Sequence, residues 1–383
     1  MTLCCSSGYN YGRRTAVDRT IFEYGNRLAF HPGYYVRKYI EYNGYSTADF
    51  AGRAGIPLKK LRTLMRGDER ISLDAAIKLG RLASTGTEYW LNHQKVYDLL
   101  VAESVNDRMN DEDSELIRTL GYGYFRDNFN LEPLPRKLSE QAEKVREIIN
   151  VSSLSILLDS GCFSGEMSDE NIMRANAMVY LALNATMRTE APRYDGGKFE
   201  KAVKEISERT ADYEGFVDSA FSSFRKAGVV LTVLPNIPGS KLRGACKKVG
   251  KKVMLMVSNR NTYADALSFT MMHEASHILN RDWGISMEDE KGRSETEADR
   301  YAENMLLPEE EYRAFFASRR YDRESILSFS QSLGRDPGIV VSRLQKDGVV
   351  RYDEKELNAL KHKYRVNLDL SMCISPFAIK GVN

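Results

Sequence analysis

The stretch His273-Glu274-Ala275-Ser276-His277 constrains this chain more than any other part of it. It places two of only five histidines, together with a carboxylate, within five residues. In a helix, positions four apart lie on the same face, so both imidazoles can bind one zinc ion. The carboxylate between them then lies next to a water that the ion holds. The motif therefore predicts a helix with a zinc site and the chemistry of a metallopeptidase.

Two histidines leave a catalytic zinc ion one protein ligand short, because the fourth position is kept for water. The candidates are downstream acids: Asp282, Glu288, Asp289, Glu290, Glu295 and Glu297. A buried helical stripe separates the last two candidates, and it consists of Ala298, Tyr301, Ala302, Met305 and Leu306. At ~100° per residue, Glu295 lies about 50° from the centre of this stripe and Glu297 about 110°. Glu295 is therefore the predicted third ligand.

Two further acids complete the predicted centre. Asp299 follows Glu295 by four residues and shares its helix face, so it can accept the free ring N–H of a ligating histidine. The alternative for Asp299 is an exposed helix acid. Glu274 is the predicted catalytic residue, which takes a proton from the attacking water and passes it to the leaving amine. The other histidines, His31, His93 and His362, are predicted to be surface or core residues.

Length and cysteine usage set the broad class of the protein. The 383 residues suffice for two or three domains and can bury a full core without metal or disulfide support. The five cysteines are scattered and lack C-x-x-C spacing, which argues against a disulfide framework and a cysteine zinc site. No apolar run approaches 18 residues, and no apolar signal segment opens the chain. We therefore expect a cytoplasmic protein without a membrane partner.

The periodicity of apolar residues divides the chain into five segments. An irregular arm is expected over residues 1–29, and a series of short helices follows at 31–43, 47–54, 57–66, 73–84 and 87–102. Residues 104–227 form a helical middle segment. Short β-branched runs then predict strands at 229–234 and 253–257, with 243–249 as a candidate third. A helix is expected from 262 through 277 with a weak capping box, and further helices to about 365.

The predicted fold class is thus mostly α with a small β-sheet. It comprises an N-terminal helix-turn-helix domain over residues 30–103, the helical middle segment, and a C-terminal α+β domain over residues 228–365. Residues 366–383 are left as a tail.

Residues 47–66 have the pattern of a helix-turn-helix. Ala51 is small where two helices cross, and Gly55 permits a left-handed turn between them. With Leu61 and Leu64 inward, the outward residues of the second helix are Lys59, Lys60, Arg62, Thr63 and Arg66. These side chains can reach phosphates and base edges. The alternative is an ordinary helical hairpin with a solvated basic face.

The charge distribution is consistent with an acidic partner for this region. Residues 1–100 contain fifteen Lys and Arg against nine Asp and Glu, which is a net charge of +6. The whole chain carries +2, so the remainder carries −4. The basic excess at the N-terminal end suits DNA, although a solvated surface explains it equally well.

Residues 228–365 resemble the ImmA/IrrE family of zinc metallopeptidases. The resemblance is carried by the two strands, by Phe269 with the histidine motif, and by the segment 295–308. The family places its third zinc ligand at the position of Glu295, and Ser276 stands where it usually has glycine. The resemblance implies a zincin-like fold and the cleavage or control of a repressor-type protein.

Residues 31–103 resemble the HigA-type antitoxin branch of the repressor-like helix-turn-helix family. The residues that carry this resemblance are His31-Pro32-Gly33, the segment 71–76, Trp90-Leu91-Asn92, Gln94 and Tyr97-Asp98-Leu99. It implies binding of operator DNA, usually as a homodimer, and a toxin gene nearby.

Two functional hypotheses follow from these patterns. The favoured one is a DNA-binding transcriptional regulator whose zinc endopeptidase domain cleaves or controls a repressor-type protein. The other is an antitoxin-like repressor of a toxin-antitoxin system, in which the metallopeptidase fold only binds or senses. Both expect operator DNA and a repressor or toxin protein as partners. Dependence of protein cleavage on Glu274 distinguishes them.

Overall fold

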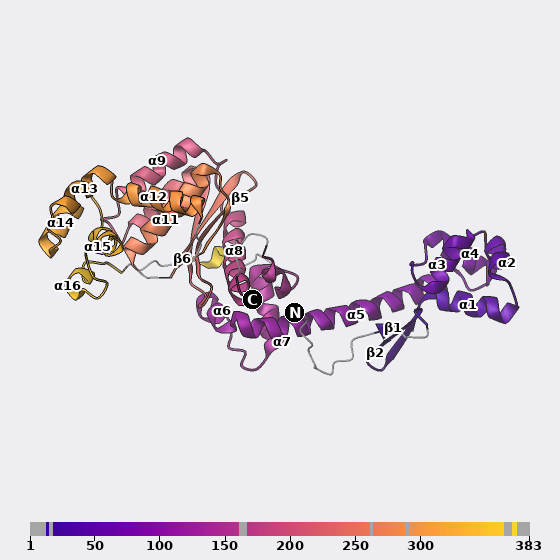
Figure 1. The fold of residues 1–383 in the computed structure, drawn as a ribbon. Coiled ribbons are helices and arrows are strands. Elements are labelled where there is room, and N and C mark those ends of the chain that lie inside the picture. Colours follow the sequence, from indigo (N-terminus) through magenta and orange to yellow (C-terminus); the bar gives the residue numbers. More distant parts are fainter. Residues whose placement is uncertain are drawn as a thin grey trace. The chain divides into compact units, whose positions relative to one another are not determined.

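The computed structural model describes residues 13–14, 18–160, 167–260, 263–287, 292–363 and 370–373. The chain divides into two compact units, Met1–Glu112 and Asp113–Asn383, and helix α5 (Thr87–Leu120) spans the boundary between them (Figure 1). The described residues are mostly helical with two small sheets, which confirms the predicted fold class. None of the helices that the structure describes is long and apolar enough to cross a membrane.

The first unit contains the predicted series of short helices. They are α1 (Pro32–Asn43), α2 (Thr47–Ala54), α3 (Leu58–Arg66) and α4 (Leu73–Leu82), followed by α5. Capping side chains set three of the starts, because His31, Ser46 and Ser72 each accept a hydrogen bond from a backbone N–H of the first turn. Their shared core includes Val36, Phe50, Leu61, Leu79 and Trp90.

The helix-turn-helix geometry of α2 and α3 depends on two glycines. Gly55 adopts φ +62 and ends α2, and its N–H donates to the carbonyls of Ala51 and Gly52. Gly33 lies where α1 meets α3, and a Cβ at this position would be 1.9 Å from the carbonyl oxygen of Leu64. The two helices approach this closely only because Gly33 has no side chain.

The prediction of an irregular arm over residues 1–29 is wrong for its last part. Strands β2 (Ile21–Tyr24) and β3 (Arg27–Phe30) form an antiparallel hairpin, and β1 (Arg13–Arg14) pairs with β2. Phe22 and Ala29 of the hairpin are buried against Tyr97 and Leu100 of α5. Tyr97 and Leu100 lie far from the hairpin in the sequence. The pattern of the two short strands therefore gives no sign that one face of the hairpin is buried.

Helix α5 also continues well beyond the predicted end at residue 102. No glycine or proline occurs between residues 87 and 120. The helix ends at Leu120, before Gly121, which adopts φ +86. The charged and polar sequence after 102 weakens the apolar periodicity without breaking the helix.

The second unit is built on a four-stranded sheet with the order β4-β6-β5-β7. Strands β4 (Val229–Pro235) and β6 (Lys252–Asn259) are parallel, and β5 (Leu242–Val249) runs antiparallel to β6 and to β7 (Gly284–Met287). The three predicted strands are confirmed. β7 was missed, because a four-residue strand with a single branched aliphatic residue lies in a stretch that reads as helical.

Helices cover both faces of this sheet, so alternate strand residues enter two different cores (Figure 1). Leu231 and Val257 face one core, whereas Met254 and Met256 face the other. The first core is covered mainly by α9 (Gly196–Ser207), α10 (Phe216–Lys226), α11 (Ala264–Asn280), α12 (Arg293–Leu306) and α15 (Pro337–Lys346). Burial on both faces explains why the strands read as continuous apolar runs.

The opposite face of the sheet lies against the first part of the middle segment and against a short helix from the segment predicted as a tail. It is covered by α6 (Tyr122–Phe129), α7 (Leu138–Ile149), α8 (Asp169–Arg188), and the short helices η1 (Leu154–Leu158) and η2 (Leu370–Cys373). The remaining helices, α13 (Glu309–Ala317), α14 (Arg323–Ser332) and α16 (Lys355–Asn358), lie on the other side with α15. The middle segment therefore shares its cores with the sheet rather than folding separately from it.

Candidate metal centre

Helix α11 carries the histidine motif in the interior of the second unit. His273, Glu274 and His277 are 0%, 0% and 6% exposed. The helix begins at Ala264 without a side-chain cap, and Thr262 of the predicted capping box lies outside the described residues. The carboxylate of Asp265 instead accepts a hydrogen bond from Ser342 of α15, which ties the start of α11 to that helix.

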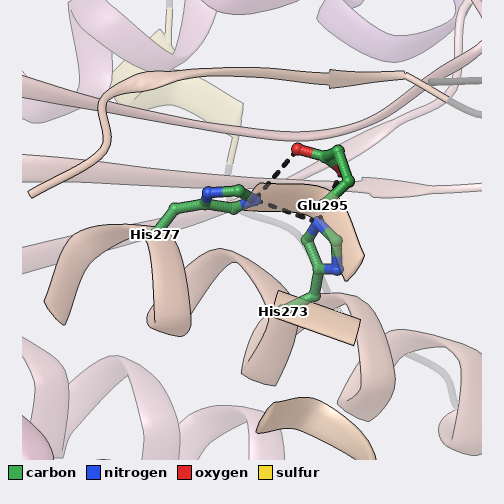
Figure 2. A group of neighbouring side chains, drawn as sticks. All are labelled: His273, His277 and Glu295. Carbon is green, nitrogen blue, oxygen red and sulfur yellow. Dashed lines mark hydrogen bonds and ion pairs between the residues drawn. The ribbon is translucent and has the colours of Figure 1, made fainter. Parts of the chain in front are cut away.

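Three side chains that can each offer a ligand atom to a metal ion converge between α11 and α12 (Figure 2). The Nε2 atoms of His273 and His277 lie 3.1 Å apart. The two carboxylate oxygens of Glu295 lie 3.1 Å from Nε2 of His273 and 3.2 Å from Nε2 of His277. Donors held about 2.0–2.1 Å from one tetrahedral zinc ion lie roughly 3.3 Å from each other. The measured separations are close to this value, with a different oxygen of Glu295 facing each histidine, so the three side chains suit one metal ion of the size of zinc.

Helix α12 presents Glu295 from the edge of the same face that packs inward. Ala298, Ala302 and Leu306 are buried, in agreement with the apolar stripe inferred from the sequence. Glu297 points outward, with a side chain 54% exposed and paired with Arg293. The other acids considered as third ligands, Glu288, Asp289 and Glu290, lie outside the described residues.

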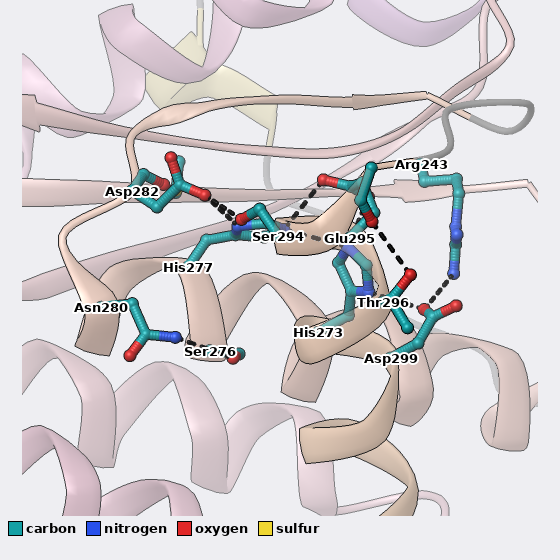
Figure 3. A network of polar contacts seen from close by, with 12 residues as sticks. Arg243, His273, Ser276, His277, Asn280, Asp282, Ser294, Glu295, Thr296 and Asp299 are labelled. Atoms are coloured by element: carbon teal, nitrogen blue, oxygen red, sulfur yellow. Dashed lines mark hydrogen bonds and ion pairs between the residues drawn. The ribbon is translucent and has the colours of Figure 1, made fainter.

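Two carboxylates orient the imidazoles from behind (Figure 3). Asp299 Oδ1 lies 2.9 Å from Nδ1 of His273, and Asp282 Oδ2 lies 3.2 Å from Nδ1 of His277. Because a carboxylate only accepts, each Nδ1 carries the proton, and each neutral ring presents an Nε2 lone pair to the centre. Two lone pairs and the carboxylate of Glu295 thus meet at one point, which requires positive charge there.

The contacts between these imidazoles and carboxylates also shift the pKa values of His273 and Glu295. Burial opposes protonation of His273, but its hydrogen bonds with Asp299 and Glu295 prevail and raise its pKa to about 9. Burial also acts to raise the pKa of Glu295, yet the two histidines lower it to about 2. Without a metal, a proton supplies the positive charge at neutral pH. Metal binding displaces that proton and is favoured by rising pH.

The sequence predicts Asp282 only as a candidate zinc ligand, and no motif indicates a role for Arg243 or Ser294. The left-handed conformation of Arg281, φ +58, ends α11 and turns the chain so that Asp282 returns to His277. Ser294 donates to Asp282 from the start of α12. Arg243 of β5 lies 3.6 Å from Asp299 (Figure 3). Asp282 lies close to the histidine motif in the sequence, which could have indicated its contact with His277. No comparable sign in the sequence indicates the role of Arg243.

Glu274 lies between the two histidines of the motif but does not belong to the cluster of three ligands. Neither of its carboxylate oxygens has a hydrogen-bond partner among the described residues, although Ser286 of β7 lies close enough to favour the charged form. Burial nevertheless raises the pKa of Glu274. A buried carboxylate without a partner costs stability, and such groups are concentrated at functional sites.

Gly244 makes room for this carboxylate. A Cβ on Gly244 of β5 would lie 2.5 Å from Oε1 of Glu274. The sequence contains no sign of this role, because the glycine is required by a side chain on a different element. The contact fixes the distance between α11 and the sheet.

We therefore expect Gly244→Ala to lower the free energy of unfolding by about 1–3 kcal/mol, because the new methyl group overpacks this contact. Urea denaturation of the metal-free chain measures the effect. Gly284→Ala is the matched control, since Gly284 lies in the same sheet and a Cβ there meets nothing within 4 Å. Equal stability of the two variants would show that Glu274 does not press against β5.

The remaining residues singled out from the sequence lie elsewhere. Lys59, Lys60, Arg62 and Arg66 are exposed on α3. Thr63 is half-buried, and its hydroxyl contacts the carbonyl of Lys60 and the carboxylate of Glu69. The outward face of α3 is therefore basic, as the helix-turn-helix pattern predicts.

The other three histidines have local packing roles. Nδ1 of His31 accepts a hydrogen bond from the backbone N–H of Gly33 at the start of α1. His93 packs against Tyr35 and Tyr89, and His362 stacks on Tyr213. None of them belongs to the cluster on α11 and α12.

A comparison with protein families gives a match for the part of the chain that contains this centre. Residues 227–344 match the IrrE N-terminal-like domain, Peptidase_M78. The matched range runs from just before β4 into α15 and contains both histidines, Glu274, Glu295 and Asp299. The match supports the ImmA/IrrE resemblance and a peptidase-like domain, and this family is typically metal-dependent.

The IrrE-like match does not extend to residues 1–226, so it says nothing about the helix-turn-helix or the middle segment. No curated protein and no solved structure matches the chain.

Proposed function

We propose that the protein is a DNA-binding transcriptional regulator with a zinc-dependent endopeptidase domain that cleaves or controls a repressor-type protein. One observation carries the proposal. The Nε2 atoms of His273 and His277 and the carboxylate of Glu295 converge on a point that requires a cation, beside the fully buried carboxylate of Glu274. The IrrE-like match over this region supports a peptidase.

Each residue of the centre has a distinct part in the proposed reaction. His273, His277 and Glu295 would hold the zinc ion, while Asp299 and Asp282 keep the two imidazoles in the binding tautomer. Zinc, when bound, activates a water molecule and polarises the scissile carbonyl. Glu274 accepts a proton at its carboxylate and delivers it to the leaving amine. Its raised pKa and burial suit a group that must be protonated and deprotonated in turn.

Two measurements test the peptidase. Inductively coupled plasma mass spectrometry of the purified chain should find one zinc per molecule. Mass spectrometry should then detect cleavage when the zinc-loaded chain is incubated with the regulators and toxins encoded beside its gene. Stoichiometric zinc without cleavage of any of these proteins would favour the alternative, in which the domain only binds or senses a partner.

The DNA-binding part of the proposal rests on the exposed basic face of α3. We expect Lys59→Ala and Arg62→Ala each to weaken binding to the DNA upstream of the gene. Each should also reduce the salt dependence of binding, by about 0.9 in the slope of log K against log salt for each phosphate that the variant no longer neutralises. Fluorescence anisotropy at several salt concentrations measures both effects.

Lys38→Ala provides the control for this experiment. Lys38 is an exposed cation of the same unit, but it lies on α1 and pairs with Glu41. Its substitution removes the same charge without touching α3, so it should change the binding much less. Binding that is equally affected by all three substitutions, or by none, would reject α3 as the recognition helix.

A further inference from the structure

A cavity of about 640 Å³ begins at the metal centre and passes along strand β7. His277 and Glu295 line one end of it. Ile285 of the strand β7 also lines it, as do Ile156 of η1 and Val179 and Leu183 of α8, a helix that packs on the other face of the sheet from α11 and α12. The cavity therefore connects the candidate zinc site, on one face of the sheet, with α8 and η1 of the middle segment on the other.

The two ends of the cavity differ in chemistry. The metal end contains imidazole and carboxylate groups, whereas aliphatic side chains dominate the end at α8. Ile156 is 37% exposed, and Leu183 is half-buried. Asn176, the amide at this end, donates its N–H groups to the carbonyls of Leu157 and Asp159. The charged residues that border this end, Asp159 and Lys247, are exposed. The α8 end is therefore suited to an uncharged, apolar group.

Strand β7 explains how one ligand could reach both ends. In the described part of the sheet it is an edge strand, because β5 is its single neighbour. Its residues alternate between the faces: Ser286 lies near Glu274, whereas Ile285 packs with the core beneath α8. An extended peptide along β7 alternates in the same way. When one of its residues reaches the metal centre, the side chain of the next points toward α8.

We propose that α8 and η1 form a specificity pocket for an apolar side chain of the protein that is cleaved, next to the scissile bond. This inference rests on the proposed peptidase function. Helix α8 and η1 lie outside the matched residues 227–344, so the preference belongs to this chain and not to the matched domain in general. The pocket also gives the middle segment a role in substrate choice.

Direct binding tests the pocket without relying on turnover. The probe is a set of fluorescent decapeptides, varied one position at a time between leucine, alanine, aspartate and lysine, and added to the zinc-loaded full-length Glu274→Gln chain. Anisotropy should reveal one position at which leucine binds best. Leu183→Ala and Ile156→Ala, each made in this background, should reduce the affinity for that leucine peptide about tenfold, because each removes apolar pocket surface.

Two further variants separate specificity from folding. Met187→Ala removes an exposed side chain of the same helix that does not line the cavity, so its binding should stay unchanged. Leu183→Met keeps the apolar volume and should keep the preference for leucine. Thermal unfolding followed by circular dichroism reports any loss of fold in the alanine variants.

The outcomes distinguish the pocket from the catalysis. Absence of peptide binding, equal affinity for charged and apolar residues, or a leucine preference that survives both alanine substitutions would overturn the pocket. If the leucine preference depends on Leu183 and Ile156, but the wild-type chain cuts none of the peptides, the pocket stands and the proposed cleavage fails. If the wild type cuts, the same preference should appear next to the cut bond.

Discussion

Replacing His277 with alanine should remove zinc from the protein, from one ion per chain to less than about 0.1 after dialysis. The substitution takes away one of three donors and leaves His273 and Glu295 to hold the ion, which is too few for a stable site. Plasma mass spectrometry of the dialysed protein measures the zinc content. Retention of one zinc per chain in this variant would reject the ligand set.

Two comparison variants sharpen the zinc experiment. His93→Ala removes a histidine that packs against tyrosines away from the cluster, and it should keep its zinc. Asp282→Asn keeps all three donors but removes the carboxylate that orients His277, so zinc affinity should fall about 10- to 100-fold without being abolished. A competition titration with a chelator resolves this intermediate effect. The three variants thus separate direct ligands, orienting residues and unrelated histidines.

The second large effect is expected for Glu274→Gln, which should slow protein cleavage by about 10²- to 10⁴-fold while zinc stays bound. The amide has nearly the shape of the carboxylate but cannot take up the proton. It also replaces a fully buried carboxyl group that has no hydrogen-bond partner among the residues that the structure describes, so the thermal midpoint should stay the same or rise. Cleavage rates, zinc content and thermal unfolding measured on the same preparation test all three expectations.

Glu297→Gln is the matched control, because Glu297 is exposed on α12 and pairs with Arg293 away from the centre. It should change neither cleavage nor zinc content. Full activity of Glu274→Gln would remove Glu274 from the mechanism, and loss of its zinc would make Glu274 a ligand instead. If the chain neutralises a toxin and Glu274→Gln leaves that neutralisation intact, the result would favour the non-catalytic hypothesis over the peptidase hypothesis.

Much of the fold could be predicted where the cause is local. The spans of α2 and α3 agree closely with the prediction, because a serine cap and a left-handed glycine lie within the segment itself. The strands β4 and β6 could be recognised because both of their faces are buried, which leaves a continuous apolar run. The position of Glu295 followed from the angle between residues on one helix.

Features that depend on distant partners could not be predicted. The hairpin of β2 and β3 forms because α5 covers Phe22 and Ala29, and β7 forms because β5 offers it an edge. The role of Gly244 is invisible in the sequence, since only the nearby carboxylate of Glu274 requires a glycine there. Each of these features depends on how two elements pack together, and the residue pattern within either element does not indicate it.

The sequence by itself determined the type of chemistry, because helical spacing puts His273 and His277 on one face and Glu295 on the inward face of another helix. The tertiary structure decided how that chemistry is held and what lies next to it. It brings Asp282 and Asp299 behind the imidazoles, packs Glu274 against β5, and places α8 along the cavity that leads to the centre. These are distances between separate elements, and they exist only once the sheet and its two helical layers have packed together.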